Sequence, residues 1–147
     1  MNLSQHFTLA EFMLSNEAGR RGIDNTPPVE LYAALKRTAL GLETVRMRLG
    51  GMPIVVSSGY RCMALNEAIG SKSTSQHLKG EAADFICPRF GNPTAVVAAL
   101  RDSDVPYDQL ILEFVRNGGG WTHVSFSTNP RRQAFALDEG GPRPLFT

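Results

Sequence analysis

The sequence predicts an α+β domain in which helices pack on an antiparallel β-sheet. The longest run of helical periodicity lies in the first third of the chain, whereas the last third contains two alternating apolar segments, 109–115 and 121–127, joined by a glycine-rich link. Helices early and strands late are typical of this fold class. At 147 residues the chain fits one domain, with helices at about 8–50, an α+β core at about 53–138 and a loose tail at 139–147.

The helical part is marked by start and stop signals. Thr8 and Glu11 stand three residues apart and form a capping box for a short helix. Thr26, followed by two prolines, is expected to open the longest helix, because proline suits a first helical turn. Gly50 and Gly51 end it. Its apolar stripe recurs at helical spacing and comprises Leu31, Leu35, Leu42, Val45 and Leu49.

The remainder alternates strands with short helices. Residues 53–58 have the β-branched content of a buried strand. Asn92, followed by proline, is a helix start signal. The other expected segments are a helix at 64–69, a polar loop at 71–80, a strand at 82–87, a helix at 94–101 and a strand at 131–137.

Composition limits the class of protein. The chain is 42% hydrophobic and 20% charged with a net charge of +1, which is ordinary for a globular protein and offers no basic patch for nucleic acid. No apolar stretch is long enough for membrane insertion, and no signal sequence is recognised, so synthesis in the cytoplasm is expected. A monomer is the default expectation. Cys62 and Cys87 are expected to be buried free thiols, with a bridge between them as the alternative.

Two of the three histidines lie where they could bind a metal. His77 is in the polar loop before Asp84, and His123 is in the strand at 121–127. Catalytic zinc needs about three histidine or carboxylate ligands and an open position for water, and these residues supply that number. Spacing does not decide the matter, because a lone histidine is more often a surface or core residue. His6 has no suitable partner in its pattern.

The predicted hairpin places a carboxylate beside these residues. If its turn is centred near Asn117-Gly118, Glu113 lies across from Trp121 and diagonal to His123. A slip of one residue would reverse this conclusion. Alternation puts one set of side chains on the metal-facing side, namely Gln109, Ile111, Glu113, Trp121, His123 and Ser125. The opposite, apolar set is Leu110, Leu112, Phe114, Val124 and Phe126.

Several motifs together resemble the M15 peptidase family. They are Ser58-Gly59-Tyr60-Arg61, the SxHxxGxAxD pattern at 75–84, and Trp121-x-His123-x-Ser125. Segments 7–12, 23–27 and 108–111 are also similar to the short, phage-associated branch of D-Ala-D-Ala carboxypeptidases and endolysins. The resemblance covers most of the chain and implies a fold of the hedgehog and D-Ala-D-Ala peptidase type.

The resemblance also implies roles for individual residues. His77, Asp84 and His123 match the ligands of one Zn²⁺ ion. Arg61 matches an arginine that binds substrate or stabilises the developing oxyanion, which its planar, permanently charged group suits. Ser75 is expected to support the site by hydrogen bonding.

One position departs from the family pattern. Many relatives carry the catalytic acid three residues before the last histidine ligand, but that position here is Gly120. We therefore predict Glu113 as the general base, because a carboxylate near a zinc-bound water can take its proton. Asp108 is the reserve candidate, since it matches an acid in this branch. On the metal-facing side, Trp121, Ser125 and Gln109 are expected to contact substrate or support the site.

The predicted function is zinc-dependent hydrolysis of the stem peptide of bacterial peptidoglycan. Carboxypeptidase and endolysin-type endopeptidase activities use the same apparatus, and both stay open. Action at the cell wall is expected to need release by a partner such as a holin. The alternatives are a zinc-binding but inactive module for wall binding or phage assembly, and a structural protein whose histidines bind nothing.

Overall fold

The structure confirms the α+β class. It is a computed structural model that describes residues 1–116 and 118–146. Its centre is a six-stranded sheet in the order β1-β2-β4-β3-β5-β6, and every neighbouring pair is antiparallel except β3 and β5. The strands are β1 (Val55–Ser58), β2 (Ala82–Ile86), β3 (Gln109–Glu113), β4 (Trp121–Ser125), β5 (Gln133–Asp138) and β6 (Gly141–Arg143).

Two short helices, α1 (Leu9–Met13) and α2 (Asn16–Arg21), open the chain. The predicted capping box of α1 is present. The Thr8 hydroxyl accepts a hydrogen bond from the Glu11 amide at 3.2 Å, and the Glu11 carboxylate accepts one from the Thr8 amide at 3.0 Å. The start of the fold therefore follows from local signals.

The longest helix, α3 (Tyr32–Arg48), begins later than predicted. The two prolines are not its first turn, because Pro28 is extended and a 3-10 turn, η1 (Val29–Leu31), intervenes. Thr26 instead donates its hydroxyl to Asp24 at 2.6 Å. The predicted stripe is confirmed, since four of its five members are completely buried and Leu31 is partly buried. The four are Leu35, Leu42, Val45 and Leu49.

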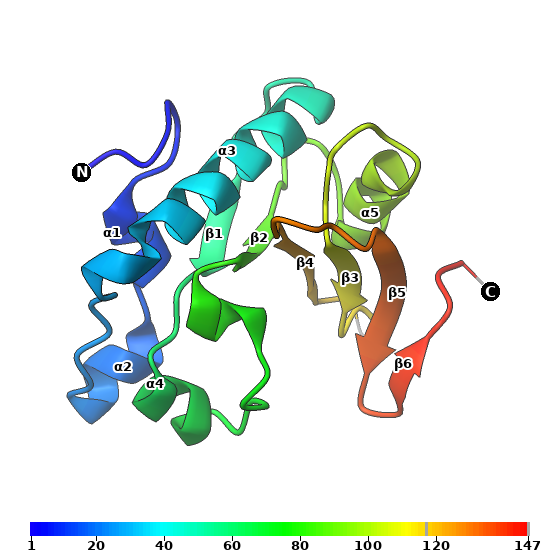
Figure 1. Cartoon of the computed structure of the whole chain (residues 1–147). Helices are drawn as coiled ribbons and strands as arrows, with labels where there is room; N and C mark the ends of the chain where they lie inside the picture. The colour runs from blue at the N-terminus through cyan, green and yellow to red at the C-terminus, as the bar shows by residue number, and fades with distance from the viewer. Residues whose placement is uncertain (117, 147) are drawn as a thin grey trace.

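The helices α3 and α5 (Pro93–Arg101) cover one face of the sheet, as Figure 1 shows. Asn92 caps α5 as predicted, accepting a hydrogen bond from the Ala95 amide. The sheet contributes Phe85, Leu110 and Val124 to the core beneath these helices. Because side chains alternate along a strand, the residues between them point to the other face. That face carries the candidate site.

The segment 139–147, predicted as a loose tail, includes the short strand β6. Gly141–Arg143 pairs with β5, and the Arg143 guanidinium lies 3.0 Å from the buried Asp138 carboxylate. Leu145, only 7% exposed, packs into the core. Pairing of β6 with the sheet and burial of Leu145 hold this segment in place. The short Gly- and Pro-rich sequence predicts neither feature.

Both cysteines are free thiols. Cys87 is buried as expected, whereas Cys62 is only partly buried, at the start of helix α4 (Met63–Ala68). Throughout residues 1–116 and 118–146, no helix has the length and apolar character of a transmembrane span.

Candidate metal centre

Three potential metal ligands converge from three different elements. Asp84 on β2 and His123 on β4 are direct partners in the antiparallel register. His77 lies on a 3-10 turn, η2 (Gln76–Lys79), which leads into β2. Gly80 ends this turn with a left-handed backbone (φ +71°), and glycine adopts that conformation without strain. The short reversal brings His77 back over Asp84.

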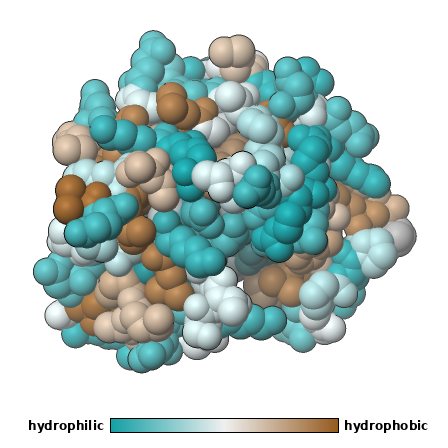
Figure 2. Space-filling model, in the orientation of Figure 1, coloured by the Kyte–Doolittle hydropathy of each residue, from teal (hydrophilic) through white to brown (hydrophobic). Residues whose placement is uncertain are grey.

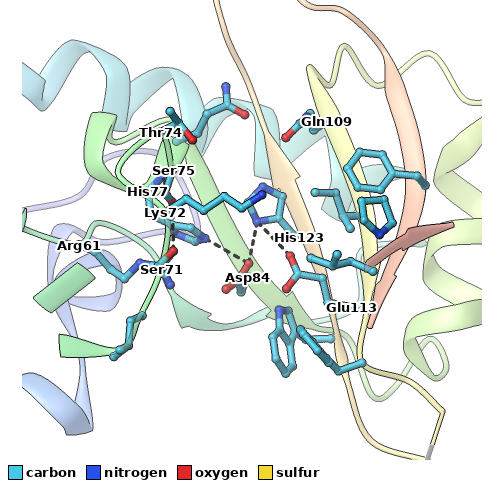
Figure 3. A pocket seen from close by; sticks show the side chains of 18 of the residues that line it. Arg61, Ser71, Lys72, Thr74, Ser75, His77, Asp84, Gln109, Glu113 and His123 are labelled. Carbon is cyan, nitrogen blue, oxygen red and sulfur yellow. Dashed lines mark hydrogen bonds and ion pairs between the residues drawn. The ribbon is translucent and has the colours of Figure 1, made fainter. Parts of the chain in front are cut away.

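The distances among these groups suit a zinc ion. His77 Nε2 lies 3.3 Å from Asp84 Oδ1, and His123 Nδ1 lies 2.9 Å from the same oxygen. One potential ligand atom from each residue lies within 4.8 Å of the other two. Zinc bonds of about 2.0–2.2 Å in tetrahedral array put neighbouring ligand atoms about 3.3 Å apart. Figure 3 shows the two imidazoles on either side of Asp84.

Hydrogen bonding fixes which nitrogen of His77 is free. Its Nδ1 lies 2.6 Å from the Gly59 carbonyl oxygen, which can only accept, so Nδ1 carries the proton. In a neutral ring, Nε2 then presents its lone pair toward Asp84. An outer hydrogen bond of this kind is the usual way in which proteins orient a metal-binding histidine.

The electrostatics keep Asp84 ionised. Burial opposes its negative charge, but the adjacent His77 and His123 outweigh this and hold the pKa of Asp84 well below its usual range. Two imidazoles and one carboxylate form a donor set that zinc binds. Ser75 supports the turn, because its hydroxyl accepts a hydrogen bond from the His77 amide at 3.2 Å.

Glu113 lies beside this cluster in the predicted register. It pairs with Trp121, and its Oε1 lies 3.6 Å from His123 Nδ1. Burial, together with repulsion from Asp84, raises the pKa of Glu113 to about 7. Asn117, at the centre of the predicted turn, is outside the described residues. The pKa values of the two carboxyl groups are therefore shifted in opposite directions, that of the buried Asp84 downward and that of the partly buried Glu113 upward.

The alternation predicted for this hairpin is wrong at one residue. Phe114 was expected in the core, but it lines the cleft, with its ring 5.4 Å from that of Trp121. The cause is its left-handed backbone (φ +56°), which ends the regular alternation of β3. Leu110, Leu112, Val124 and Phe126 are buried as predicted.

Gly120 occupies the position where the family pattern implies an acid, and the hairpin leaves no room there for a side chain. Its φ is +85°, and a Cβ added there would lie 2.3 Å from the carbonyl oxygen of Glu113. A carboxylate side chain at residue 120 is therefore incompatible with this hairpin.

Arg61 reaches the cluster from the segment after β1. Its Nη2 donates to the Ser75 hydroxyl at 3.1 Å, and its Nε is buried with no hydrogen-bond partner among the described residues. Burial lowers the pKa of the guanidinium, while the charges of Asp84 and Glu113 raise it. A fixed cation of this kind faces the same space as the metal ligands.

These groups border a cleft of about 670 Å³. One wall is polar and comes from residues 69–76, and the other is largely apolar. Figure 2 shows a hollow on this face with hydrophobic residues at its base and hydrophilic ones at its rim. The apolar residues include Ile111, Phe114, Trp121, Phe135, Leu137 and Pro142. The volume and shape suit a short peptide.

The other predicted site residues occupy different places. Gln109 and Trp121 line the cleft. Ser125 is completely buried, and its hydroxyl accepts a hydrogen bond from the Gln109 amide, so it joins β3 to β4. Asp108 lies apart from the metal cluster, in an ion pair with Arg131 at 2.7 Å, and this pair lowers the pKa of Asp108 to about 2.

Comparison with known proteins agrees with this geometry. Residues 5–125 match the family described as Peptidase M15. The chain belongs to this family. It is also 31% identical over 80 residues to the zinc D-Ala-D-Ala carboxypeptidase of Streptomyces albus G. The aligned segment covers 54% of this chain and 31% of that relative, so the chain spans about a third of the length of the relative.

The residues bordering the cleft of this M15 chain that sequence reasoning missed include Lys72, Gln76 and Arg131. Gln76 stands next to His77, which was the available signal. No sequence signal marked Arg131, because its position depends on the parallel pairing of β3 with β5. Strand β5 lies beyond the matched residues 5–125.

Proposed function

We propose that this chain is a zinc-dependent peptidase that hydrolyses the stem peptide of bacterial peptidoglycan. The observation that carries the proposal is the convergence of His77, Asp84 and His123 within 4.8 Å at the base of a peptide-sized cleft. Membership of the M15 family supports it, as does a relative named as a zinc D-Ala-D-Ala carboxypeptidase.

The donor set would hold one zinc ion through His77 Nε2, Asp84 and His123 Nδ1. Zinc bound there would supply Lewis acidity to a water molecule and to the scissile carbonyl. Glu113, 3.6 Å from His123, would take the proton of the attacking water and return it to the leaving amine. A pKa near 7 suits a group that must both accept and donate a proton near neutrality.

Arg61 would stabilise the negative oxygen that develops on the scissile carbonyl. Its hydrogen bond to Ser75 holds the guanidinium in place before the reaction, so little reorganisation is needed when charge develops. Partial burial strengthens the interaction, because less water screens the charge.

Two activities share this apparatus. A D-Ala-D-Ala carboxypeptidase removes the terminal residue of the stem peptide, and an endolysin-type endopeptidase cuts within it or its cross-link. The fragment masses distinguish the two, because each bond leaves a different product.

The test is mass spectrometry of purified muropeptides after incubation with zinc-loaded protein. We expect defined peptide fragments with the wild type and none with Asp84→Ala, which also loses zinc. If zinc binds at a ratio of one per chain but no fragment appears, the peptidase proposal is wrong and the inactive wall-binding module takes its place.

A further inference from the structure

The three metal-binding side chains are not held in place in the same way. Asp84 and His123 are fixed by direct strand pairing of β2 with β4. His77 lies outside the sheet, on η2. Two hydrogen bonds of this turn lead away from β3 and β4: the Gly80 carbonyl accepts from the Thr38 hydroxyl on α3 at 2.7 Å, and the His77 carbonyl accepts from the Arg61 amide at 3.2 Å. Its tie to β3 and β4 must come from another residue.

Gln76, the first residue of η2, supplies that tie. Its Nε2 donates to Asp108 Oδ2 at 2.9 Å and to Glu81 Oε1 at 3.2 Å. Because both partners are carboxylates that only accept when ionised, the amide nitrogen must face them, and the side chain has a single orientation. The backbone repeats the link to Glu81, whose amide donates to the Gln76 carbonyl at 3.1 Å.

Asp108 is itself immobilised, so it can serve as an anchor. It is 1% exposed. Arg131 binds its carboxylate with three donors, the backbone amide at 2.8 Å, Nε at 2.9 Å and Nη2 at 2.7 Å. The Asp108 amide donates to the Ser125 carbonyl at 2.7 Å, at the end of the strand that carries His123. The chain of contacts therefore runs from the His77 turn to the His123 strand.

We propose that Gln76 and Asp108 are positioning residues that set the distance between His77 and the ligands on the sheet. The inference rests on the proposed zinc site. It assigns Asp108 an indirect role in place of proton transfer, because its carboxylate is occupied by Arg131 and Gln76. It also gives Arg131, which follows the residues matched to the family, a part in the metal centre.

The experiment measures zinc affinity by competition with a chromogenic chelator, together with the melting temperature of the zinc-free protein. Gln76→Met keeps the side-chain volume but removes the donor, and Asp108→Asn removes the charged anchor. The matched control is Asp138→Asn. Asp138 is also a buried aspartate paired with arginines, Arg116 and Arg143, but it does not border the cleft.

Loss of an outer partner of a metal ligand weakens metal binding by about 10–100-fold. We expect a loss in this range for Gln76→Met and Asp108→Asn, and wild-type affinity for Asp138→Asn even where its melting temperature falls. Wild-type zinc affinity in Gln76→Met would overturn the inference, as would an equal loss in the Asp138 control. If the wild type itself binds no zinc, the proposed function fails as well, so the two failures are distinguishable.

Discussion

At the scale of single residues, the cleft holds two carboxyl groups, the buried Asp84 and the partly buried Glu113, whose pKa values are shifted in opposite directions. Two imidazoles lower the pKa of Asp84 despite burial, so it stays charged. Burial and the charge of Asp84 raise the pKa of Glu113 to about 7. Pairs of carboxyl groups separated in this way are typical of sites where one group binds or stabilises and the other transfers a proton.

Replacing Glu113 by Gln should separate these two roles. The variant keeps the shape of the side chain but cannot accept a proton, so turnover of muropeptides should fall by about 10²–10⁴-fold while zinc stays bound. Turnover and metal content measured on the same sample check this. The control is Glu43→Gln, which should keep wild-type turnover. Glu43 is a half-buried glutamate that forms hydrogen bonds with Ser4 and His6 instead of with the residues of the cleft. Near-normal turnover in Glu113→Gln would remove Glu113 from the mechanism.

The lowered pKa of Asp108 predicts a pH-dependent contribution to stability. Its pKa is about 2 in the folded protein against 3.8 for an unperturbed group, so the folded state favours the ionised form above pH 3.8. This contribution, about 2 kcal/mol at neutral pH, is lost as the pH falls toward 2. Asp108→Asn should therefore be less stable than wild type at pH 7, and the difference should shrink below pH 4. Denaturant titrations at several pH values test it, and a constant difference would contradict it.

At the scale of elements, the geometry of the β3–β4 hairpin determines which of its residues can bring a carboxylate to the site. Its register places Glu113 opposite Trp121 and next to His123. Its return path brings Gly120 so close to the Glu113 carbonyl that no side chain fits there. The same turn therefore excludes an acid at residue 120 and presents one from residue 113.

Gly120→Ala should destabilise the protein by about 1–3 kcal/mol, since a left-handed backbone strains any residue with a Cβ. The clash with the Glu113 carbonyl should also lower activity. Gly119→Ala is the matched control, because an added Cβ there meets nothing within 4 Å. Thermal melts compare the two variants, and equal stabilities would contradict the assigned role of Gly120.

The hairpin also shows how far the sequence could be interpreted. Alternation and a glycine-rich link were enough to place Glu113 beside His123, because both are local properties of two adjacent strands. Phe114 does not follow the same rule, because its backbone is left-handed (φ +56°) and ends the alternation of β3. The bond from Gln76 to Asp108 joins residues 32 positions apart and depends on tertiary packing, which no spacing encodes. The parallel pairing of β5 with β3, which brings Arg131 to the cleft, was likewise unpredictable.

At the scale of the whole molecule, the two faces of the sheet have different roles: one packs against the core, and the other carries the candidate site. Helices α3 and α5 cover one face (Figure 1). The side chains of the candidate site border the cleft on the other face. The potential ligands lie on η2 and on two adjacent strands, β2 and β4. A metal bound there would add a link between the η2 turn and the paired strands β2 and β4.

Zinc should therefore stabilise the folded protein. A ligand that binds only the folded state at 100 times its dissociation constant adds about 2.7 kcal/mol, which for a domain of this size corresponds to about 5–10 °C in Tm. Calorimetry with added zinc, and again after EDTA, measures the shift. His77→Ala should melt at the same temperature under both conditions. An unchanged Tm in the wild type would favour a structural protein whose histidines bind nothing.

The most direct measurement is a crystal structure of the zinc-loaded protein with anomalous scattering recorded at the zinc absorption edge. We predict a single anomalous peak about 2.0–2.2 Å from His77 Nε2, an oxygen of Asp84 and His123 Nδ1. A structure with no peak among these three side chains, or with zinc bound by other residues, would contradict the metal centre and the peptidase mechanism built on it.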